Sequence, residues 1–249
     1  MPVDPSQVTL TVNVFPFSDW EPLEVNLEMV SVALPFAAAG GLLYAFQPYH
    51  YYRGEAHYFL AEARYSAQLS HPHVVQVHDL GEDGDSLYLV MEYLDGENLS
   101  TVRRMGLKHE SPLLDHFAVR LISWAADGLH YAHTRVGVDG RPLGLVHRDI
   151  SPQNLFATFD GGLKVLDFGV AKLAHQSTSS GKLKGKLGYM SPEQADGLAI
   201  DRRSDIFALG VVAHELSTVR RLFKGDNDLH TLRLIRETNV KPPSAHTPN

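Results

Sequence analysis

The chain has 249 residues, of which 44% are hydrophobic and 20% charged, so we expect one globular domain or two closely joined lobes with a large core. The net charge of −7 argues against a nucleic-acid-binding protein, which usually presents a basic face. Cysteine is absent, which excludes a disulfide framework and cysteine-based metal sites and suits a reducing cytosol. The 14 histidines are scattered without an HExxH spacing, which favours surface and capping roles over metal binding.

The first fifty residues carry weak structural signals. Residues 8–14 alternate like a short strand. Residues 29–50 are uncharged and mostly apolar, but Pro35 and Gly40-Gly41 interrupt them. We therefore expect buried strands or an irregular segment, with a membrane span as the alternative. The first twenty residues lack the basic start and apolar run of a secretory signal.

The middle of the chain predicts a helix and then a hairpin. Phe59, Ala63 and Ala67 recur at helical spacing within residues 54–69, and His71-Pro72 ends that segment. Residues 74–78 and 87–91 are predicted strands, and residues 81–85 are the turn between them.

Helices dominate the second half. Residues 113–133 predict a long amphipathic helix, and residues 201–216 a second apolar one. Short strands are predicted at 145–146 and 163–166. Strands first and helices later predict an α+β, two-lobed fold. The side chains available for a core on the first helix are Phe117, Leu121, Trp124, Leu129 and Ala132.

Three polar motifs carry the chemistry. Residues 147–154 read H-R-D-x-x-x-x-N, and Asp167-Phe168-Gly169 lies 18 residues after Asp149. Ser191-Pro192-Glu193 follows. In this order and at this spacing the strings resemble the catalytic loop, the metal-binding loop and the end of the activation segment of protein kinases. An Asp-rich turn between strands would explain neither the order nor the spacing.

From about residue 55 onward the chain resembles the bacterial serine/threonine protein kinases of the eukaryotic type, in the subgroup whose loop reads HRDxSPQN. The resemblance implies an atypical segment at 1–54, the rest of a small lobe at 55–95 and a large lobe at 96–249. It implies a protein substrate and a cytoplasmic location. The net charge argues against a nucleic-acid partner, and the interrupted hydropathy of residues 29–50 argues against a membrane span. Sugar and antibiotic phosphotransferases are disfavoured, because they usually carry another residue in place of Arg148 and lack the Ser-Pro-Glu segment.

The same resemblance implies roles for single residues. Asp149 would orient the substrate hydroxyl and accept its proton late, while Asn154 and Asp167 would ligate Mg²⁺. Asp205 would fix the backbone of the catalytic loop, and His147 and Phe168 would stack in the internal spine. The residues implied in binding ATP are Glu62 of the C-helix, Met91, Glu92 and Leu94 of the gatekeeper and hinge, Asn154, Leu155 and Asp167.

Arg148 would let a phosphate on the activation segment pair with the catalytic loop. Residues 177–180 read Ser-Thr-Ser-Ser and are candidate phosphorylation sites. An ordinary exposed loop accounts for these hydroxyls equally well.

The ATP-gripping half departs from the family. No lysine precedes Lys108 and no glycine precedes Gly40. The strand-3 lysine, expected roughly 20 residues before the C-helix glutamate, and the glycine-rich loop are therefore both missing. We expect turnover slowed by orders of magnitude.

The chain departs from the family a second time, at two positions together. Ser151 stands where these kinases usually carry a lysine that touches the γ-phosphate, and Lys186 stands where they usually carry a threonine. One hypothesis is that Lys186 reaches back and supplies the missing charge. The other is that Lys186 is one more basic residue of the segment 182–186.

The sequence also stops soon after the expected helix G. We therefore expect Glu193 to lack its usual arginine partner and the helix at 201–216 to expose apolar surface. Two alternatives to a kinase remain open at this point. One is a non-catalytic pseudokinase scaffold, and the other is a degraded or mis-started kinase gene whose first 50 residues are foreign to the family.

Overall fold

The computed structural model describes residues 44–50, 66–83, 86–109, 115–137, 140–168 and 186–246. The chain divides into two compact units: residues 1–56 with 77–94, and residues 57–76 with 95–249. Several predictions lie outside the described residues: the strand at 8–14, most of the segment 29–50, nearly all of the helix at 54–69, Glu62, Gly169 and the hydroxyls at 177–180. The predicted domain boundaries at 54 and 95 stay a prediction.

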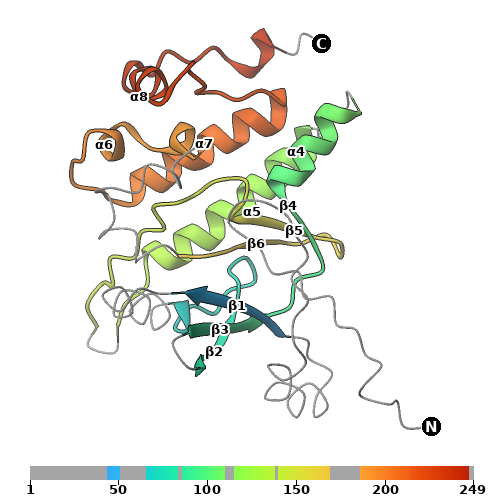
Figure 1. Cartoon of the computed structure of the whole chain (residues 1–249), viewed down its shortest axis with the longest axis vertical. Helices are drawn as coiled ribbons and strands as arrows, with labels where there is room; N and C mark the ends of the chain where they lie inside the picture. The colour runs from blue at the N-terminus through green and yellow to red at the C-terminus, as the bar shows by residue number, and fades with distance from the viewer. Residues whose placement is uncertain are drawn as a thin grey trace. The chain divides into compact units, whose positions relative to one another are not determined.

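The first unit contains an antiparallel three-stranded sheet in the order β1-β3-β2 (Figure 1). Its strands are β1 (Tyr44–His50), β2 (Val77–Asp83) and β3 (Ser86–Glu92). Tyr44 pairs with Glu92, and Asp83 pairs with Ser86. The predicted turn at 81–85 is thus too long, because backbone pairing continues through Gly81 to Asp83.

Val74 and Val75 belong to the second unit rather than to β2. Val74 bridges Val165 in parallel, and the Val75 amide donates to the Val165 carbonyl at 3.0 Å. The predicted strand at 74–78 was therefore wrong at its start, since the first two of its apolar residues have a different backbone partner.

A second sheet, in the order β4-β5-β6, lies in the second unit. It is antiparallel and consists of β4 (Gly96–Asn98), β5 (Leu155–Thr158) and β6 (Leu163–Val165). A Cβ on Gly96 would lie 2.1 Å from the Ala157 carbonyl oxygen, so only glycine allows β4 this close to β5. The predicted strand at 145–146 is wrong: both residues are buried but form no strand.

Helices make up most of the second unit. They are α4 (Leu99–Lys108), α5 (Asp115–His133), the short α6 (Pro192–Ala195), α7 (Arg202–Thr218) and α8 (Asp228–Glu237), with 3-10 turns η3 (Leu187–Tyr189) and η4 (Pro243–Ala245). Asp201 caps α7, its side chain accepting a hydrogen bond from the Arg203 amide. Within the described residues, no helix is long and apolar enough to cross a membrane.

The core of the second unit lies around α5, which packs between β6 and α7 (Figure 1). Its buried face runs through Ala118, Ala125, Leu129 and Ala132, at spacings of 7, 4 and 3 residues. Phe117 lies off this face and is 49% exposed, so its predicted place in the core was wrong. The two sheets and the helices make an α+β fold, as predicted.

Candidate active site

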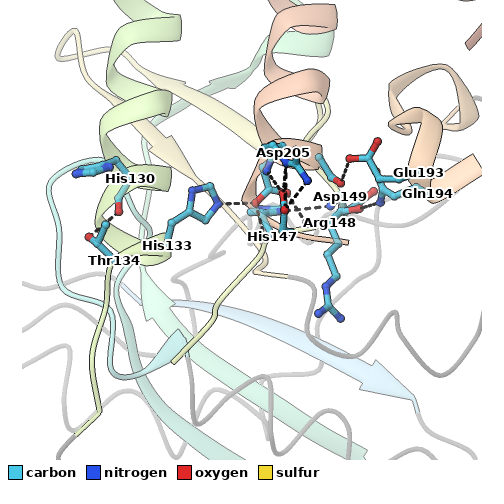
Figure 2. Close-up of polar contacts among 12 residues, drawn as sticks. His130, His133, Thr134, His147, Arg148, Asp149, Glu193, Gln194 and Asp205 are labelled. Atoms are coloured by element: carbon cyan, nitrogen blue, oxygen red, sulfur yellow. Dashed lines mark hydrogen bonds and ion pairs between the residues drawn. The ribbon is translucent and has the colours of Figure 1, made fainter. Parts of the chain in front are cut away.

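The backbone of the catalytic loop is held from α7 by one buried carboxylate. Asp205, only 1% exposed, accepts hydrogen bonds from the His147 amide at 2.8 Å and from the Arg148 amide at 2.7 Å (Figure 2). Hydrogen bonds to an ionised acceptor are among the strongest that proteins form. The two residues just before Asp149 are therefore fixed by a group 57 and 58 positions away in the sequence.

A third donor reaches the same carboxylate from the end of α5. His133 Nε2 lies 2.7 Å from Asp205 Oδ2, and both side chains are at most 4% exposed (Figure 2). A carboxylate only accepts, so this nitrogen carries the proton and donates. The sequence reasoning missed His133; its signal was a lone histidine at the end of a predicted core helix.

His147 connects the catalytic loop to the metal-binding loop. Its Nε2 donates to the Leu166 carbonyl at 2.7 Å, and its Nδ1 accepts from the Asp149 amide at 3.3 Å. These two bonds fix the tautomer with the proton on Nε2. The ring also contacts Phe168, with centroids 4.8 Å apart.

Asp149 is oriented by two side chains. Asn154 Nδ2 donates to Asp149 Oδ2 and to the Asp149 carbonyl, each at 2.8 Å. Lys186 Nζ lies 2.9 Å from the same Oδ2, and the two charged side chains are 20% and 13% exposed. The structure therefore brings Lys186 and the predicted catalytic carboxylate together in a largely buried ion pair.

Ser151 is completely buried, and its hydroxyl has no hydrogen-bond partner among the described residues. A short side chain enclosed in this way cannot extend to a bound nucleotide. Any positive charge near a transferring phosphate must then come from another residue.

Arg148 has a left-handed backbone with φ of 68°, a conformation that costs a non-glycine residue about 1–3 kcal/mol. Its guanidinium extends away from Asp205 (Figure 2), and Nε and Nη1 are buried with no partner in the described part of the chain. Burial lowers the pKa of Arg148, and the negative charge of Asp205 opposes that shift. Such a cation is suited to receive an anion.

Glu193 has a hydrogen-bond partner on α7. The Ser204 hydroxyl of α7 donates to Glu193 Oε1. Burial raises the pKa of Glu193, but the hydrogen bonds from Ser204 and from backbone N–H outweigh it and hold the pKa below its usual range. Ser204, in the first turn of α7, thus contacts the carboxylate that was expected to lack its usual arginine partner.

Two oxygen-bearing side chains can hold a metal ion. Asn154 spends its N–H donors on Asp149, and no described residue hydrogen-bonds its Oδ1. Asp167 supplies a carboxylate from a left-handed residue with φ of 49°. The Leu166 amide donates to the Asn154 carbonyl at 2.9 Å, which ties the two loops together. An amide oxygen and a carboxylate suit Mg²⁺, so this donor set fits the predicted ion.

The other predicted nucleotide contacts are spread over the chain. Met91 and Glu92 end β3, and Leu94 follows in the same unit. Leu155 begins β5 in the second unit and is fully buried. The roles of these four residues in binding ATP stay predictions.

The comparisons with known proteins agree with this arrangement. A family model described as "Protein kinase domain" matches residues 48–247. The chain belongs to the protein kinase family. The fold class and the resemblance drawn from the sequence are thereby confirmed.

Relatives of this kinase domain occur in several bacteria. The tyrosine-protein kinase MasK of Myxococcus xanthus is 46% identical over 195 residues, covering 77% of this chain and 30% of MasK. The serine/threonine-protein kinase PknB of Mycobacterium tuberculosis is 34% identical over 197 residues, covering 76% and 30%. A probable serine/threonine-protein kinase of Clostridium acetobutylicum is 34% identical over 187 residues, covering 74% and 27%. The chain thus spans less than a third of the length of these relatives.

Proposed function

We propose that this kinase domain transfers the γ-phosphate of ATP to a serine or threonine hydroxyl of a protein, with Mg²⁺ as the metal and the cytoplasm as its location. The observation that supports it most is the setting of Asp149. Asp205 holds the backbone of the two residues before it, and its carboxylate is held by Asn154 at 2.8 Å and Lys186 at 2.9 Å. Positioning and electrostatics supply nearly all of the catalysis in phosphoryl transfer.

In this reaction Asp149 orients the hydroxyl group that accepts the phosphate. The hydroxyl oxygen forms a bond to the γ-phosphorus while the bond from that phosphorus to the β–γ bridging oxygen breaks. ADP leaves, and the hydroxyl proton passes late to Asp149. Asn154 keeps the carboxylate facing the acceptor by donating from its amide.

Asn154 and Asp167 would hold Mg²⁺, which when bound neutralises charge on the phosphates. Lys186 takes over the role of the missing catalytic-loop lysine. Its ammonium is already beside Asp149, and the fully buried Ser151 leaves that role open. In addition to Mg²⁺, the positive charge of Lys186 beside the reacting phosphate would stabilise the transition state of the transfer.

Arg148 would pair with a phosphate on the activation segment. Its two unpartnered nitrogens support this, because a buried cation without an anion is costly. The hydroxyls at residues 177–180 are the candidate acceptors of that phosphate, and they lie outside the described residues.

Tyrosine is the second candidate acceptor. The relative MasK is named a tyrosine-protein kinase and is 46% identical to this chain, whereas PknB is named a serine/threonine kinase. Phosphoamino-acid analysis of acceptor protein labelled with [γ-³²P]ATP decides between them. Phosphoserine and phosphothreonine support the proposal, and phosphotyrosine alone overturns its choice of acceptor.

Measurements of nucleotide binding and of turnover together distinguish an active kinase from a pseudokinase scaffold. The missing lysine and glycine-rich loop predict weak ATP binding and slow transfer. Mg-ATP should raise the melting temperature of the purified chain, since a ligand that binds only the native state stabilises it. No shift together with no autophosphorylation would remove the enzymatic function and leave the scaffold.

A further inference from the structure

We propose that Gln194 is a positioning residue for the transfer reaction, joining the start of α6 to the catalytic loop. Its side-chain amide forms two hydrogen bonds in opposite directions. Oε1 accepts from the Ser191 amide at 3.0 Å, and Nε2 donates to the Arg148 carbonyl at 2.9 Å (Figure 2). The inference rests on the proposed function and adds a residue that no sequence motif had assigned to the reaction.

The chemistry of both neighbours fixes the orientation of this amide. The Ser191 N–H can only donate, and the Arg148 carbonyl can only accept. Turning the amide over would place two donors, and separately two acceptors, face to face. Gln194 therefore does more than complete the capping box of α6, in which the Ser191 side chain also accepts from the Gln194 amide.

The bond to Arg148 acts on the peptide that leads into Asp149. Asp205 holds the amides of His147 and Arg148 on one side, and Gln194 holds the carbonyl of Arg148 on the other. Arg148 lies between these two anchors in its left-handed conformation. Non-glycine residues keep such a conformation only where the surroundings determine it. Gln194 thus sets the position of Asp149 through the backbone, without touching a substrate.

Gln194 also follows directly on Ser191-Pro192-Glu193, so it ties the end of the activation segment to the loop that carries the catalytic carboxylate. A change at the end of that segment would reach the peptide before Asp149 through this side chain, independently of the direct ion pair that Lys186 makes with Asp149. Glutamate at this position isolates the effect, because a carboxylate still accepts from the Ser191 amide and keeps the capping box. It loses the donor to the Arg148 carbonyl and sets two oxygens against each other.

The test compares Gln194→Glu with the wild type and with Asn227→Ala. Asn227 caps α8 by accepting from the His230 amide, so its loss destabilises the fold without touching the catalytic loop. We expect Gln194→Glu to lower kcat by roughly tenfold to a hundredfold, with the KM for ATP nearly unchanged. Asn227→Ala should lower the melting temperature and spare kcat. A kcat for Gln194→Glu no lower than that of Asn227→Ala would overturn the proposal.

Amide hydrogen exchange gives a readout that does not depend on activity. In Gln194→Glu the amides of Arg148 and Asp149 should exchange faster, while those of the α5 core keep their protection. If the wild type transfers no phosphate, the proposed function fails. Faster exchange at the amides of Arg148 and Asp149 would still support the proposal that Gln194 holds the Arg148 carbonyl. Unchanged exchange there contradicts it.

Discussion

At the catalytic loop, the departure from the family's charge pattern centres on Lys186. Its Nζ lies 2.9 Å from Asp149 Oδ2, while the position that usually provides the lysine holds the buried Ser151. We predict that Lys186→Met lowers kcat roughly a hundredfold, as expected for the loss of one preorganised charge beside the transition state. The exposed Lys224 provides the matched control. Small and equal losses in Lys186→Met and Lys224→Met would refute the assignment.

His71 makes the stability of the fold depend on pH. Its ring stacks on Tyr131 with centroids 4.9 Å apart, and its Nδ1 accepts from the His73 amide at 3.2 Å. Burial lowers the pKa of His71 below 6.5, Asp127 partly opposes this, and His73 and Lys164 add to it. Between the lowered native pKa and 6.5, the unfolded chain binds more protons than the native one, so stability falls as the pH drops through this window.

We therefore predict that His71→Asn flattens the dependence of unfolding free energy on pH below 6.5, in the window down to the lowered native pKa. Urea denaturation across that range measures it. His130→Asn is the control, because this histidine is exposed on α5. If His71→Asn keeps the slope of the wild type, the pH response arises elsewhere.

At the scale of elements, α7 is the support of the catalytic loop. Asp205, in its first turn, receives the amides of His147 and Arg148 and the ring of His133. We predict that Asp205→Asn lowers the free energy of unfolding by roughly 2–4 kcal/mol, because buried donors lose their acceptor. Asp201→Asn makes the same chemical change on the same helix at its exposed cap, where asparagine caps as well as aspartate. Chemical denaturation should give Asp201→Asn an unfolding free energy close to that of the wild type. Equal losses of unfolding free energy in both variants would contradict a supporting role for Asp205.

Sequence predicted the elements whose signals are local and long. The helices at 113–133 and 201–216 appear as α5 and α7 within two residues at each end. Short strands were less predictable, because pairing over long sequence distance decides them. Leu155–Thr158 became β5, whereas residues 145–146, equally apolar, stayed outside any strand.

In the candidate site, too, some residues could be predicted from the sequence and others could not. Motif spacing predicted Asp149, Asn154 and Asp167. The electrostatic argument proposed that Lys186 supplies the charge missing at Ser151, and the structure shows that its partner is Asp149. The supports of these residues come from pairs distant in sequence, such as His133 with Asp205, Gln194 with Arg148 and Ser204 with Glu193. Single histidines, glutamines and serines have many roles, so their sequence pattern alone did not indicate these partners.

At the scale of the whole molecule, the described residues hold the proposed transfer residues in place, while the sequence lacks the strand-3 lysine and glycine-rich loop. This contrast predicts a kinase domain with a high KM for ATP whose phosphate-transfer residues still act. Raising the ATP concentration should then lift transfer above background, to a kcat that stays low because the missing lysine would also contact the phosphates in the transition state. Titration of ATP in a transfer assay measures this. A turnover that stays at background at saturating ATP would instead place the defect in the transfer step.

The most direct test is transfer of labelled γ-phosphate from Mg-ATP to a protein acceptor by the wild type and by Asp149→Asn. Asparagine keeps the shape of the side chain but cannot take the hydroxyl proton. We predict measurable transfer by the wild type and loss of nearly all of it in Asp149→Asn, with both proteins folded. Equal transfer by the two proteins, or none by either, would contradict a catalytic role for the loop at residues 147–154.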